Sequence, residues 1–332
     1  MTARIGINGF GRIGRCVFRI LMGRPDCAVV GINDIGDPRT LAYLLQYDTI
    51  MRKFDRPVST RDGDLVVGDQ AIRLVREKDP AAIPWKEFGA DIVIESTGRF
   101  RKRDEIARHL DAGAGKVILT VPAKDAIDAT IVVGVNDDLL KPHHRIVSNA
   151  SCTTNCLAPI VKILEEAFGI ERGLMNTVHA YTNDQRLADV PHKDLRRSRA
   201  ASENIIPTTT GAARAVGEVL PRMKGKLDGL AMRVPVPDGS VVDLTALLRT
   251  PAGAESINEA VRKAALGPMK GIVEYSTAPI VSSDVIGNPH SSIFDSLSTQ
   301  TAGANCVKVI AWYDNEWGYA NRVVDLIGLM TR

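Results

Sequence analysis

Short apolar runs alternate with stretches of helical period through the first part of the chain. Residues 4–8 read Arg-Ile-Gly-Ile-Asn and predict a strand, and residues 28–32 read Ala-Val-Val-Gly-Ile and predict a second. Between them, Ile13, Val17 and Leu21 recur on one helical face after a glycine-rich turn. The order strand, glycine turn, helix, strand is that of a βαβ unit.

The alternation continues to about residue 150. Four further apolar runs predict strands, and one amphipathic stretch predicts a helix. The predicted strands are 91–95, 117–119, 130–133 and 145–147, and the predicted helix is 103–112. This order predicts a Rossmann-type, doubly wound and mostly parallel sheet.

The pattern changes after residue 150. A helix is predicted over 152–168 and another over 315–330, with longer strand-like segments between them at 174–180, 230–234, 241–248, 272–275 and 307–313. We therefore predict two domains: an α/β domain over 1–150, onto which the C-terminal helix 315–332 packs, and an α+β domain over 151–314 with a largely antiparallel mixed sheet. A polar stretch at about 182–204 is too long for an ordinary connection and predicts a functional loop.

Composition narrows the class of protein. The chain has 332 residues, 45% of them hydrophobic, and a formal net charge of +3. This small excess does not indicate a nucleic-acid partner but suits anionic small molecules. No apolar run is long enough to span a membrane and the first residues lack a signal-peptide core, so we expect a cytoplasmic protein without a membrane partner. Five cysteines without zinc spacing predict no metal site.

The turn after the first strand reads Gly-Phe-Gly-Arg-Ile-Gly over residues 9–14. Gly9 permits the tight turn, Gly11 lets the backbone approach a diphosphate, and Gly14 allows close helix–strand packing. The diphosphate is expected against the N–H groups near Arg12 and Ile13 at the helix N-terminus. The alternative is a purely structural turn.

Asp34 follows the second predicted strand, twenty residues after Gly14. A carboxylate there binds the adenosine ribose hydroxyls and repels a 2′-phosphate, which predicts NAD rather than NADP.

Cys152 stands among small polar residues just before the predicted helix. At a helix N-terminus, unpaired N–H groups and the helix dipole favour a thiolate, which is the nucleophilic form of cysteine. A thiolate next to a nicotinamide cofactor suits aldehyde oxidation through a hemithioacetal and a thioester, and this route needs a base. The alternative is an inert cysteine in a core helix.

His179 is the candidate base, because it lies at the end of a predicted strand where the chain enters the polar loop. A structural histidine is the alternative. We interpret the other histidines as surface or loop residues: His109, His143, His144, His192 and His290.

Candidate anion-binding groups lie further along the chain. The loop carries Arg196, Arg197 and Arg199, and residues 208–211 read Thr-Thr-Thr-Gly beside a helical start. Arg233 stands inside an apolar strand and needs a partner, for which an anionic ligand is one candidate. A solvated surface or a subunit contact is the alternative for the loop arginines.

These motifs together resemble the phosphorylating, NAD-dependent glyceraldehyde-3-phosphate dehydrogenase family over the whole length of the chain. Residues 7–15 resemble its cofactor turn, 148–155 its nucleophile signature, 179–185 its base segment and 312–319 its closing motif. Two segments, 47–54 and 235–239, depart from the commonest forms, which affects local loop geometry.

The resemblance implies oxidation of glyceraldehyde 3-phosphate to 1,3-bisphosphoglycerate with NAD and inorganic phosphate, in glycolysis or gluconeogenesis. It implies that Cys152 is the nucleophile and that His179 is the base that lowers its pKa. It implies that Thr182 and Arg233 bind the substrate phosphate, and that Ser151, Thr153, Arg197, Thr210 and Gly211 serve inorganic phosphate. Contacts to the dinucleotide are implied for Arg12, Ile13, Asp34, Lys78, Thr120 and Asn315. It also implies a homotetramer with the 182–204 loop at a subunit interface.

Three other functions remain open at this point. Erythrose-4-phosphate dehydrogenase shares the cysteine signature but differs near Thr182 and Thr208–Gly211. A non-catalytic NAD- or RNA-binding member of the family is a second. A redox sensor with Cys156 as the resolving thiol is a third, although one helical turn is an awkward geometry for a disulfide.

Overall fold

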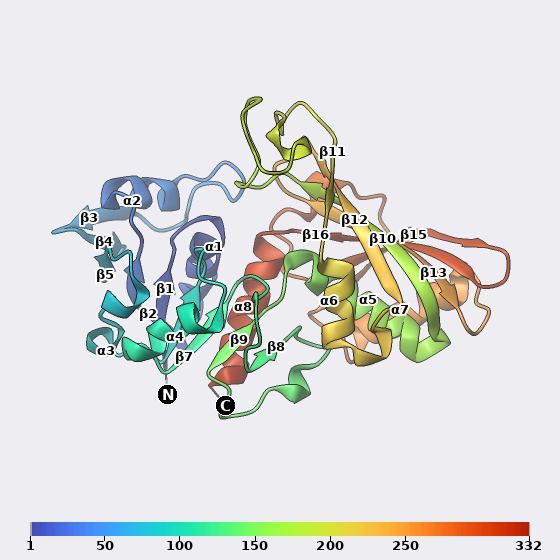
Figure 1. Ribbon diagram of the computed structural model, residues 1–332, viewed down its shortest axis with the longest axis horizontal. Coiled ribbons are helices and arrows are strands. Elements are labelled where there is room, and N and C mark those ends of the chain that lie inside the picture. Colours follow the sequence, from blue (N-terminus) through green and yellow to red (C-terminus); the bar gives the residue numbers. More distant parts are fainter. Residues whose placement is uncertain (1, 332) are drawn as a thin grey trace. The chain divides into compact units, whose positions relative to one another are not determined.

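The computed structural model describes residues 2–331, which form two compact units (Figure 1). Unit 1 contains the chain up to Ile131, Asp138–Ala150 and the chain from Ala320 onward. Unit 2 contains Val132–Asp137 and Ser151–Tyr319.

Unit 1 is built on a nine-stranded sheet with the order β3-β4-β5-β2-β1-β6-β7-β9-β8. Its strands are β1 (Ala3–Asn8), β2 (Cys27–Asn33), β3 (Val58–Arg61), β4 (Asp64–Val67), β5 (Gln70–Val75), β6 (Ile92–Glu95), β7 (Lys116–Leu119), β8 (Ala129–Thr130) and β9 (Ile146–Ser148). All pairs are parallel except β3–β4 and β4–β5. The helices are α1 (Arg12–Leu21), α2 (Pro38–Gln46), α3 (Trp85–Phe88), α4 (Arg103–Asp111) and most of α8 (Trp317–Met330).

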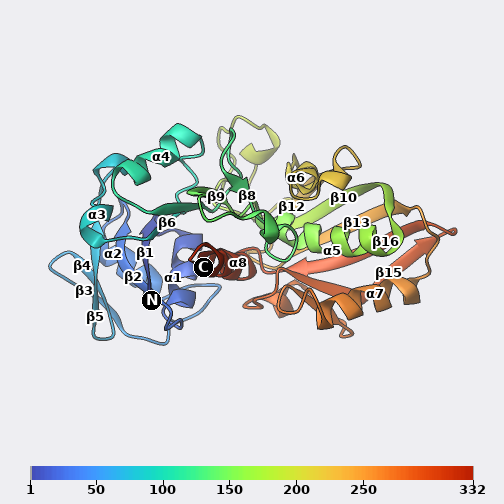
Figure 2. The same cartoon turned by 90° about the horizontal axis from the view of Figure 1, so that it is seen from below.

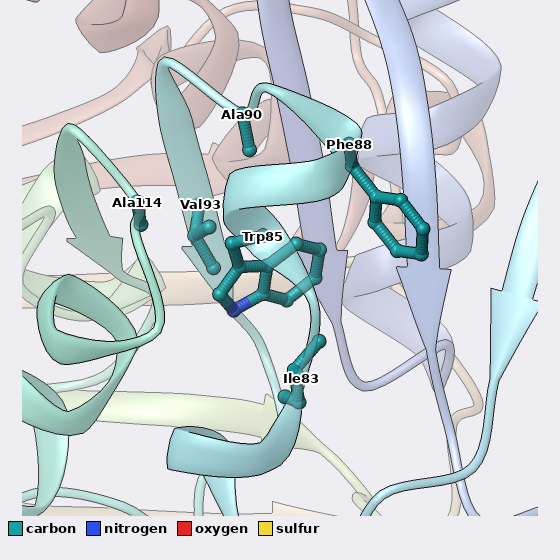
Figure 3. Packing of buried hydrophobic residues seen from close by; sticks show 6 residues of the cluster. All are labelled: Ile83, Trp85, Phe88, Ala90, Val93 and Ala114. Carbon is teal, nitrogen blue, oxygen red and sulfur yellow. The ribbon is translucent and has the colours of Figure 1, made fainter.

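Two aromatic side chains of α3 pack directly on the sheet. A Cβ at Gly6 of β1 would lie 2.6 Å from the Trp85 ring, and one at Gly31 of β2 would lie 2.3 Å from the Phe88 ring. Figure 3 shows Trp85 and Phe88 in a buried cluster with Ile83, Ala90, Val93 and Ala114. Glycines in β1 and β2 therefore make room for the largest side chains of this core.

Unit 2 is built on a seven-stranded sheet with the order β11-β12-β10-β13-β16-β15-β14. Its strands are β10 (Ile170–Ala180), β11 (Ile206–Thr209), β12 (Leu227–Val234), β13 (Ser240–Leu248), β14 (Val273–Ser276), β15 (Ser292–Ala302) and β16 (Cys306–Tyr313). The pairs β10–β12 and β14–β15 are parallel and the others antiparallel. The helices α5 (Cys152–Phe168), α6 (Ala212–Val219) and α7 (Ala254–Leu266) pack on this sheet (Figure 2).

The predicted fold class, a Rossmann-type sheet followed by a largely antiparallel mixed sheet, is confirmed. Most predicted elements are present with ends shifted by one to four residues, and α5 has the predicted bounds. Of the strand predicted at 130–133, only Thr130 lies in a strand, the two-residue β8. The helical start expected beside residues 208–211 is that of α6, and several elements have no counterpart in the prediction: β3, β4, β5, β11, β15, α2, α3 and α7.

The surface assignment of His109 is wrong. Its side chain on α4 is fully buried, with 0% exposure, because it contacts Trp85 and Glu95 through its two ring nitrogens. The charged residues around it on α4 hid this inward position in the sequence pattern.

No helix within residues 2–331 combines the length and apolarity that crossing a bilayer requires. The same part of the chain contains no group of three or more His, Cys, Asp or Glu side chains arranged to hold a metal ion.

Candidate active site

Cys152 is the first residue of α5, as predicted. Ser151 is the N-cap, and its hydroxyl accepts a hydrogen bond from the Thr154 N–H at 3.1 Å. Ala150, just before the cap, has a φ of +55°, which is uncommon for a residue with a side chain. The cap and this turn place the Cys152 sulfur at the positive end of a 17-residue helix.

Cys152 and His179 form a contacting pair. The Cys152 Sγ lies 3.5 Å from the His179 Nε2. His179 is the penultimate residue of β10, and its side chain points into the buried side of the sheet with 5% exposure. The structure thus brings together the two residues, 27 apart in the chain, that the sequence suggests as nucleophile and base.

The other ring nitrogen of His179 lies near one hydrogen-bond acceptor and one hydrogen-bond donor. Its Nδ1 lies 2.7 Å from the Ala180 carbonyl oxygen and 2.8 Å from the Arg233 Nη1. The carbonyl only accepts, so it favours a proton on Nδ1, whereas the guanidinium only donates. With the proton on Nδ1, the Nε2 lone pair faces Sγ and can accept the thiol proton.

Burial controls the charge of this pair in the absence of substrate. Burial, followed by the nearby Arg233 guanidinium, lowers the pKa of His179 to about 3. Burial also raises the pKa of the Cys152 thiol, with Arg233 as the main opposing influence. Both directions favour a neutral thiol and a neutral imidazole at rest, contrary to the lowered cysteine pKa that the sequence predicted. Proton transfer within the pair creates two opposite charges together, whose attraction offsets their burial.

Arg233 lies beside His179 in the sheet, because the two residues are partners in the parallel β10–β12 register. Its Nη1 donates to the Ala180 carbonyl at 3.0 Å and to the Thr182 hydroxyl at 3.1 Å. Its Nε is buried and has no hydrogen-bond partner within residues 2–331. The Arg233 guanidinium can therefore bind an anion next to the Cys152–His179 pair.

Asp184 joins Thr182 to Arg197. The Asp184 carboxylate accepts hydrogen bonds from the Thr182 hydroxyl and from the Arg197 guanidinium. Arg197 also donates from Nε to the Thr208 hydroxyl at 2.9 Å. The structure therefore brings together Arg197, Thr182 and Arg233, three of the predicted phosphate-binding residues.

The remaining predicted phosphate residues lie at two helix starts. Ser151 and Thr153 lie at the start of α5, in sequence next to Cys152, whereas Thr210 and Gly211 precede α6. The Thr210 hydroxyl accepts from the Ala212 N–H at 3.2 Å. The hydrogen bonds described for residues 2–331 do not join Thr210 or Gly211 to the Cys152–His179 pair.

Tyr313 belongs to the site, although the sequence pattern predicts no role for it beyond its place in the family motif. Its buried hydroxyl lies 2.8 Å from the Thr153 Oγ1 and 2.9 Å from the Thr177 Oγ1, and its ring meets the His179 ring edge-on at 6.0 Å. The alternating pattern of β16 could have predicted its inward position. The hydroxyl's two partners come from α5 and β10, which are distant in the chain.

Asn315 lies in unit 2 and is tied to the strand that carries His179. The Ser240 hydroxyl donates to the Asn315 Oδ1 at 2.6 Å and accepts from the Ala180 N–H at 3.0 Å. This link joins Asn315 to Ala180, the last residue of β10, which directly follows His179.

A second candidate site is a cavity of about 630 Å³ in unit 1. Its lining contains Asn8, Gly9, Gly11, Asn33, Asp34, Ile35, Glu77, Lys78, Ser96, Thr97, Arg99 and Phe100. A cavity of this size at the carboxyl ends of parallel strands is typical of nucleotide binding.

The glycine turn has the geometry that a dinucleotide requires. Gly9 has a φ of +90°, a Cβ at Gly14 would lie 2.1 Å from the Gly9 carbonyl oxygen, and a Cβ at Gly11 would meet no atom within 4 Å. Gly9 and Gly14 are thus needed for the turn itself, and Gly11 leaves an open approach to the backbone. The residues present fit a dinucleotide.

Asp34 and Lys78 line this cavity, as expected of cofactor-binding residues. Asp34 also accepts hydrogen bonds from the Phe10 N–H at 2.6 Å and the Gly36 N–H at 2.8 Å. Arg12 pairs with Asp48, and the Thr120 hydroxyl donates to the Glu95 carbonyl at 3.1 Å. Arg12, Ile13 and Thr120 are not among the lining residues of the cavity.

Comparisons with known proteins give the same family for both parts of the chain. Residues 3–103 match the family model for the glyceraldehyde 3-phosphate dehydrogenase NAD binding domain, and residues 151–315 match that for the C-terminal domain. Glyceraldehyde-3-phosphate dehydrogenase from Geobacillus stearothermophilus is 57% identical, covering 98% of this chain and 97% of the relative. The Mycobacterium avium protein of the same name is 56% identical, with 99% of each covered. Glyceraldehyde-3-phosphate dehydrogenase 1 from Bacillus subtilis is 54% identical, with 100% and 99% covered.

Proposed function

The chain belongs to the glyceraldehyde-3-phosphate dehydrogenase family, and we propose that it oxidises D-glyceraldehyde 3-phosphate to 1,3-bisphosphoglycerate with NAD and inorganic phosphate. This reaction serves glycolysis and gluconeogenesis. The observation that carries the proposal is the 3.5 Å contact between Cys152 and His179 beside the Arg233 guanidinium.

The first step uses the pair directly. The Cys152 Sγ attacks the aldehyde carbon while the His179 Nε2 takes the thiol proton, which gives a hemithioacetal. The negative charge that develops on the aldehyde oxygen lies near the start of α5, where the Cys152 N–H stabilises it. Tyr313 positions this end of the helix through Thr153.

The chemistry that NAD supplies when bound is acceptance of the hydride from the former aldehyde carbon. Cys152 then holds the product acyl group as a thioester. An oxygen of inorganic phosphate attacks the thioester carbonyl, and the C–S bond breaks to release the acyl phosphate and the Cys152 thiolate.

Two groups of side chains bind the phosphates in this proposal. Thr182 and Arg233 bind the phosphate of the substrate, since the hydroxyl and the guanidinium lie 3.1 Å apart next to His179. Ser151, Thr153, Arg197, Thr210 and Gly211 serve the inorganic phosphate, with hydroxyl, backbone and guanidinium donors.

In this proposal the diphosphate and the adenosine side of NAD bind to unit 1, and the chemistry belongs to unit 2. The turn of Gly9, Gly11 and Gly14 receives the diphosphate next to Arg12 and Ile13. Asp34 and Lys78 contact the adenosine side of the cofactor, and Thr120 and Asn315 contact the remainder.

Erythrose 4-phosphate is the second candidate substrate, because the same cysteine chemistry would oxidise it. A redox sensor is a less favourable interpretation, because Cys156 would have to act as its resolving thiol. Burial raises the pKa of Cys156 far above its ordinary value, and its side chain contacts Ser292 in the core, so it is a poor resolving thiol.

The deciding assay follows NADH formation from glyceraldehyde 3-phosphate and NAD, with and without inorganic phosphate. We expect sustained turnover only with phosphate and a lower kcat/KM for erythrose 4-phosphate. Cys152→Ser should lower kcat on the order of a thousandfold or more. Cys306→Ser, which changes a partly exposed thiol on β16, is the matched control. Full activity in the Cys152→Ser protein would refute the thioester route.

A homotetramer is the proposed assembly. The outward face of the unit 2 sheet carries Leu174 and Leu230, which are 67% and 42% exposed, and the 182–204 loop carries Leu187, which is 85% exposed. Apolar side chains grouped on an uncovered sheet face are typical of subunit contacts. Leu174→Glu should lower the mass measured by light scattering, whereas Leu266→Glu, at an equally exposed site on α7, should not.

A cytoplasmic location completes the proposal. All five cysteines are free thiols, which suits a reducing compartment.

A further inference from the structure

Three polar side chains form a row across adjacent strand ends in unit 1, and two of them, Asn33 and Asn8, line the cavity. Asn33, Asn8 and Glu95 end the adjacent strands β2, β1 and β6 and occupy the same register position. The Asn33 Nδ2 donates to the Asn8 Oδ1 at 2.7 Å, and the Asn8 Nδ2 donates to the Glu95 Oε2 at 2.5 Å. Three strand ends are therefore linked side chain to side chain.

Glu95 is the last residue of this row, and its carboxylate accepts the hydrogen bond from Asn8. Its side chain is 0% exposed. Besides Asn8, its Oε2 is 3.0 Å from the His109 Nε2, and its Oε1 accepts from the Thr97 N–H at 2.9 Å and from the Thr97 hydroxyl. Each carboxylate oxygen thus has two donors, which is what a buried carboxylate requires.

His109 is held in one tautomer by Trp85. The Trp85 indole N–H donates to the His109 Nδ1 at 3.0 Å. Because an indole can only donate, Nδ1 accepts and the ring proton lies on Nε2, from which it is donated to Glu95. Figure 3 shows Trp85 packed among the buried apolar side chains of its cluster.

At the other end of the row, the Asn33 side chain binds the backbone of Glu77, which also lines the cavity. The Asn33 side chain accepts from the Glu77 N–H at 2.8 Å and donates to the Glu77 carbonyl at 3.0 Å. Asn8, Asn33, Glu77 and Thr97 all line the cavity, whereas Glu95 and His109 do not.

We propose that Glu95 and His109 are positioning residues for the dinucleotide, which set the spacing of the cavity walls through Asn8, Asn33 and Thr97 without touching the ligand. The inference rests on the proposed function of this cavity as the NAD site. A pair that only stabilised the core would affect unfolding but leave the affinity of the folded protein for NAD unchanged.

Two substitutions at His109 separate positioning from packing. His109→Gln keeps an N–H donor for Glu95 and loses the ring, whereas His109→Phe keeps the ring and loses the donor. Positioning through the hydrogen bond predicts an NAD dissociation constant within about twofold of wild type for His109→Gln and about five- to tenfold higher for His109→Phe. Equal affinities, or weaker binding by His109→Gln, would overturn the proposal.

Glu95→Gln tests the acceptor itself. The amide presents N–H groups to Asn8 or Thr97, which are donors, so we expect the NAD dissociation constant from titration calorimetry to rise about tenfold or more. The KM for NAD should rise in parallel, while the KM for glyceraldehyde 3-phosphate changes less than about twofold. If this variant does not fold, the His109 pair decides the question alone.

Ile106→Val is the matched control for stability. Ile106 is buried on the same helix α4, in a cluster with Val117, Leu119 and Ile146. It should lower the midpoint of thermal unfolding and leave NAD affinity unchanged. Failure of wild type to bind NAD would refute the proposed function, whereas wild-type affinity in Glu95→Gln would refute only this inference.

Discussion

At the scale of single residues, the site depends on charges held in a dry environment. His179 is buried and Cys152 is partly buried, and Arg233 is the cation with the largest influence on the pKa of each. Burial favours the neutral forms, whereas Arg233 favours the thiolate and disfavours the imidazolium. The same arginine therefore binds the anionic substrate and biases the proton of the pair.

Arg233→Gln removes the charge and retains a hydrogen-bonding side chain. We expect the KM for glyceraldehyde 3-phosphate to rise about tenfold or more, because a charged hydrogen bond to the phosphate is lost. NAD affinity, measured by calorimetry, should be unchanged, since the cofactor cavity lies in unit 1. An unchanged KM would remove Arg233 from the substrate phosphate site.

His179 also predicts an acid sensitivity. Its folded pKa is about 3 against an ordinary value of 6.5, so between these values the unfolded chain binds a proton that the folded protein does not. The folded state therefore loses stability as pH falls below about 6.5, by about 1 kcal/mol at about pH 5.5. His179→Asn, which cannot titrate, should show a smaller drop in its unfolding midpoint between neutral and mildly acidic pH. Identical drops would contradict the lowered pKa.

At the scale of elements, the sequence predicts the helix and the strand whose ends carry the candidate catalytic residues. Apolar periodicity located α5 and β10, and therefore Cys152 and His179. It did not locate the β3–β4 hairpin, whose strands are half exposed. The Asp62-Gly63 turn was the available signal, because both residues have positive φ and this dipeptide favours such hairpins.

The parts of the site that the sequence did not predict depend on contacts between residues that are far apart in the sequence. Tyr313 bridges Thr153 and Thr177, and His109 reaches Glu95. No local pattern records which buried hydroxyl or imidazole meets which partner. The fold class and the reactive pair were therefore predictable, whereas the hydrogen-bonded support around them was not.

The glycine turn gives an element-scale prediction. A methyl group at Gly14 would overlap the Gly9 carbonyl, so Gly14→Ala must displace α1 from the turn. We expect loss of NAD binding by about tenfold or more together with a lower unfolding midpoint. Gly11→Ala, whose Cβ meets no protein atom, should weaken NAD binding without destabilising the protein. Equal destabilisation by both changes would contradict the assigned roles.

The turn between β12 and β13 contains a buried acid, Asp238, which lies beside a second buried acid, Asp314, just after β16. The Asp238 side chain is 0% exposed, and burial together with the Asp314 carboxyl beside it raises the pKa of Asp238 to about 9. The folded protein then holds a proton that the unfolded chain releases above about pH 4, so this group destabilises the fold increasingly as pH rises toward about 9.

Asp238→Asn should therefore raise the unfolding midpoint, by the equivalent of about 1 kcal/mol or more at about pH 8, and the gain should shrink at about pH 5. The amide can also donate to Asp314. Thermal unfolding at both pH values checks this, and a gain that is independent of pH would contradict the raised pKa.

At the scale of the whole molecule, each unit contains its own tryptophan residues, whose fluorescence can report the unfolding of that unit. Trp85 is in unit 1, and Trp312 and Trp317 are in unit 2. A protein with Trp312 and Trp317 replaced by Phe reports unit 1 through Trp85 alone. NAD at about a hundred times its dissociation constant should stabilise this unit by about 2.7 kcal/mol. An unchanged Trp85 transition would contradict NAD binding in unit 1.

The position of the Asp34 carboxylate limits how the coenzyme preference of this protein could be redesigned. Asp34 accepts the Phe10 and Gly36 N–H groups, so it supports the glycine turn as well as facing the cavity. Replacing it by a small neutral residue to admit a 2′-phosphate would leave two backbone donors unmatched. A redesign toward the phosphorylated coenzyme must therefore supply new acceptors for these amides before it adds any cationic side chain.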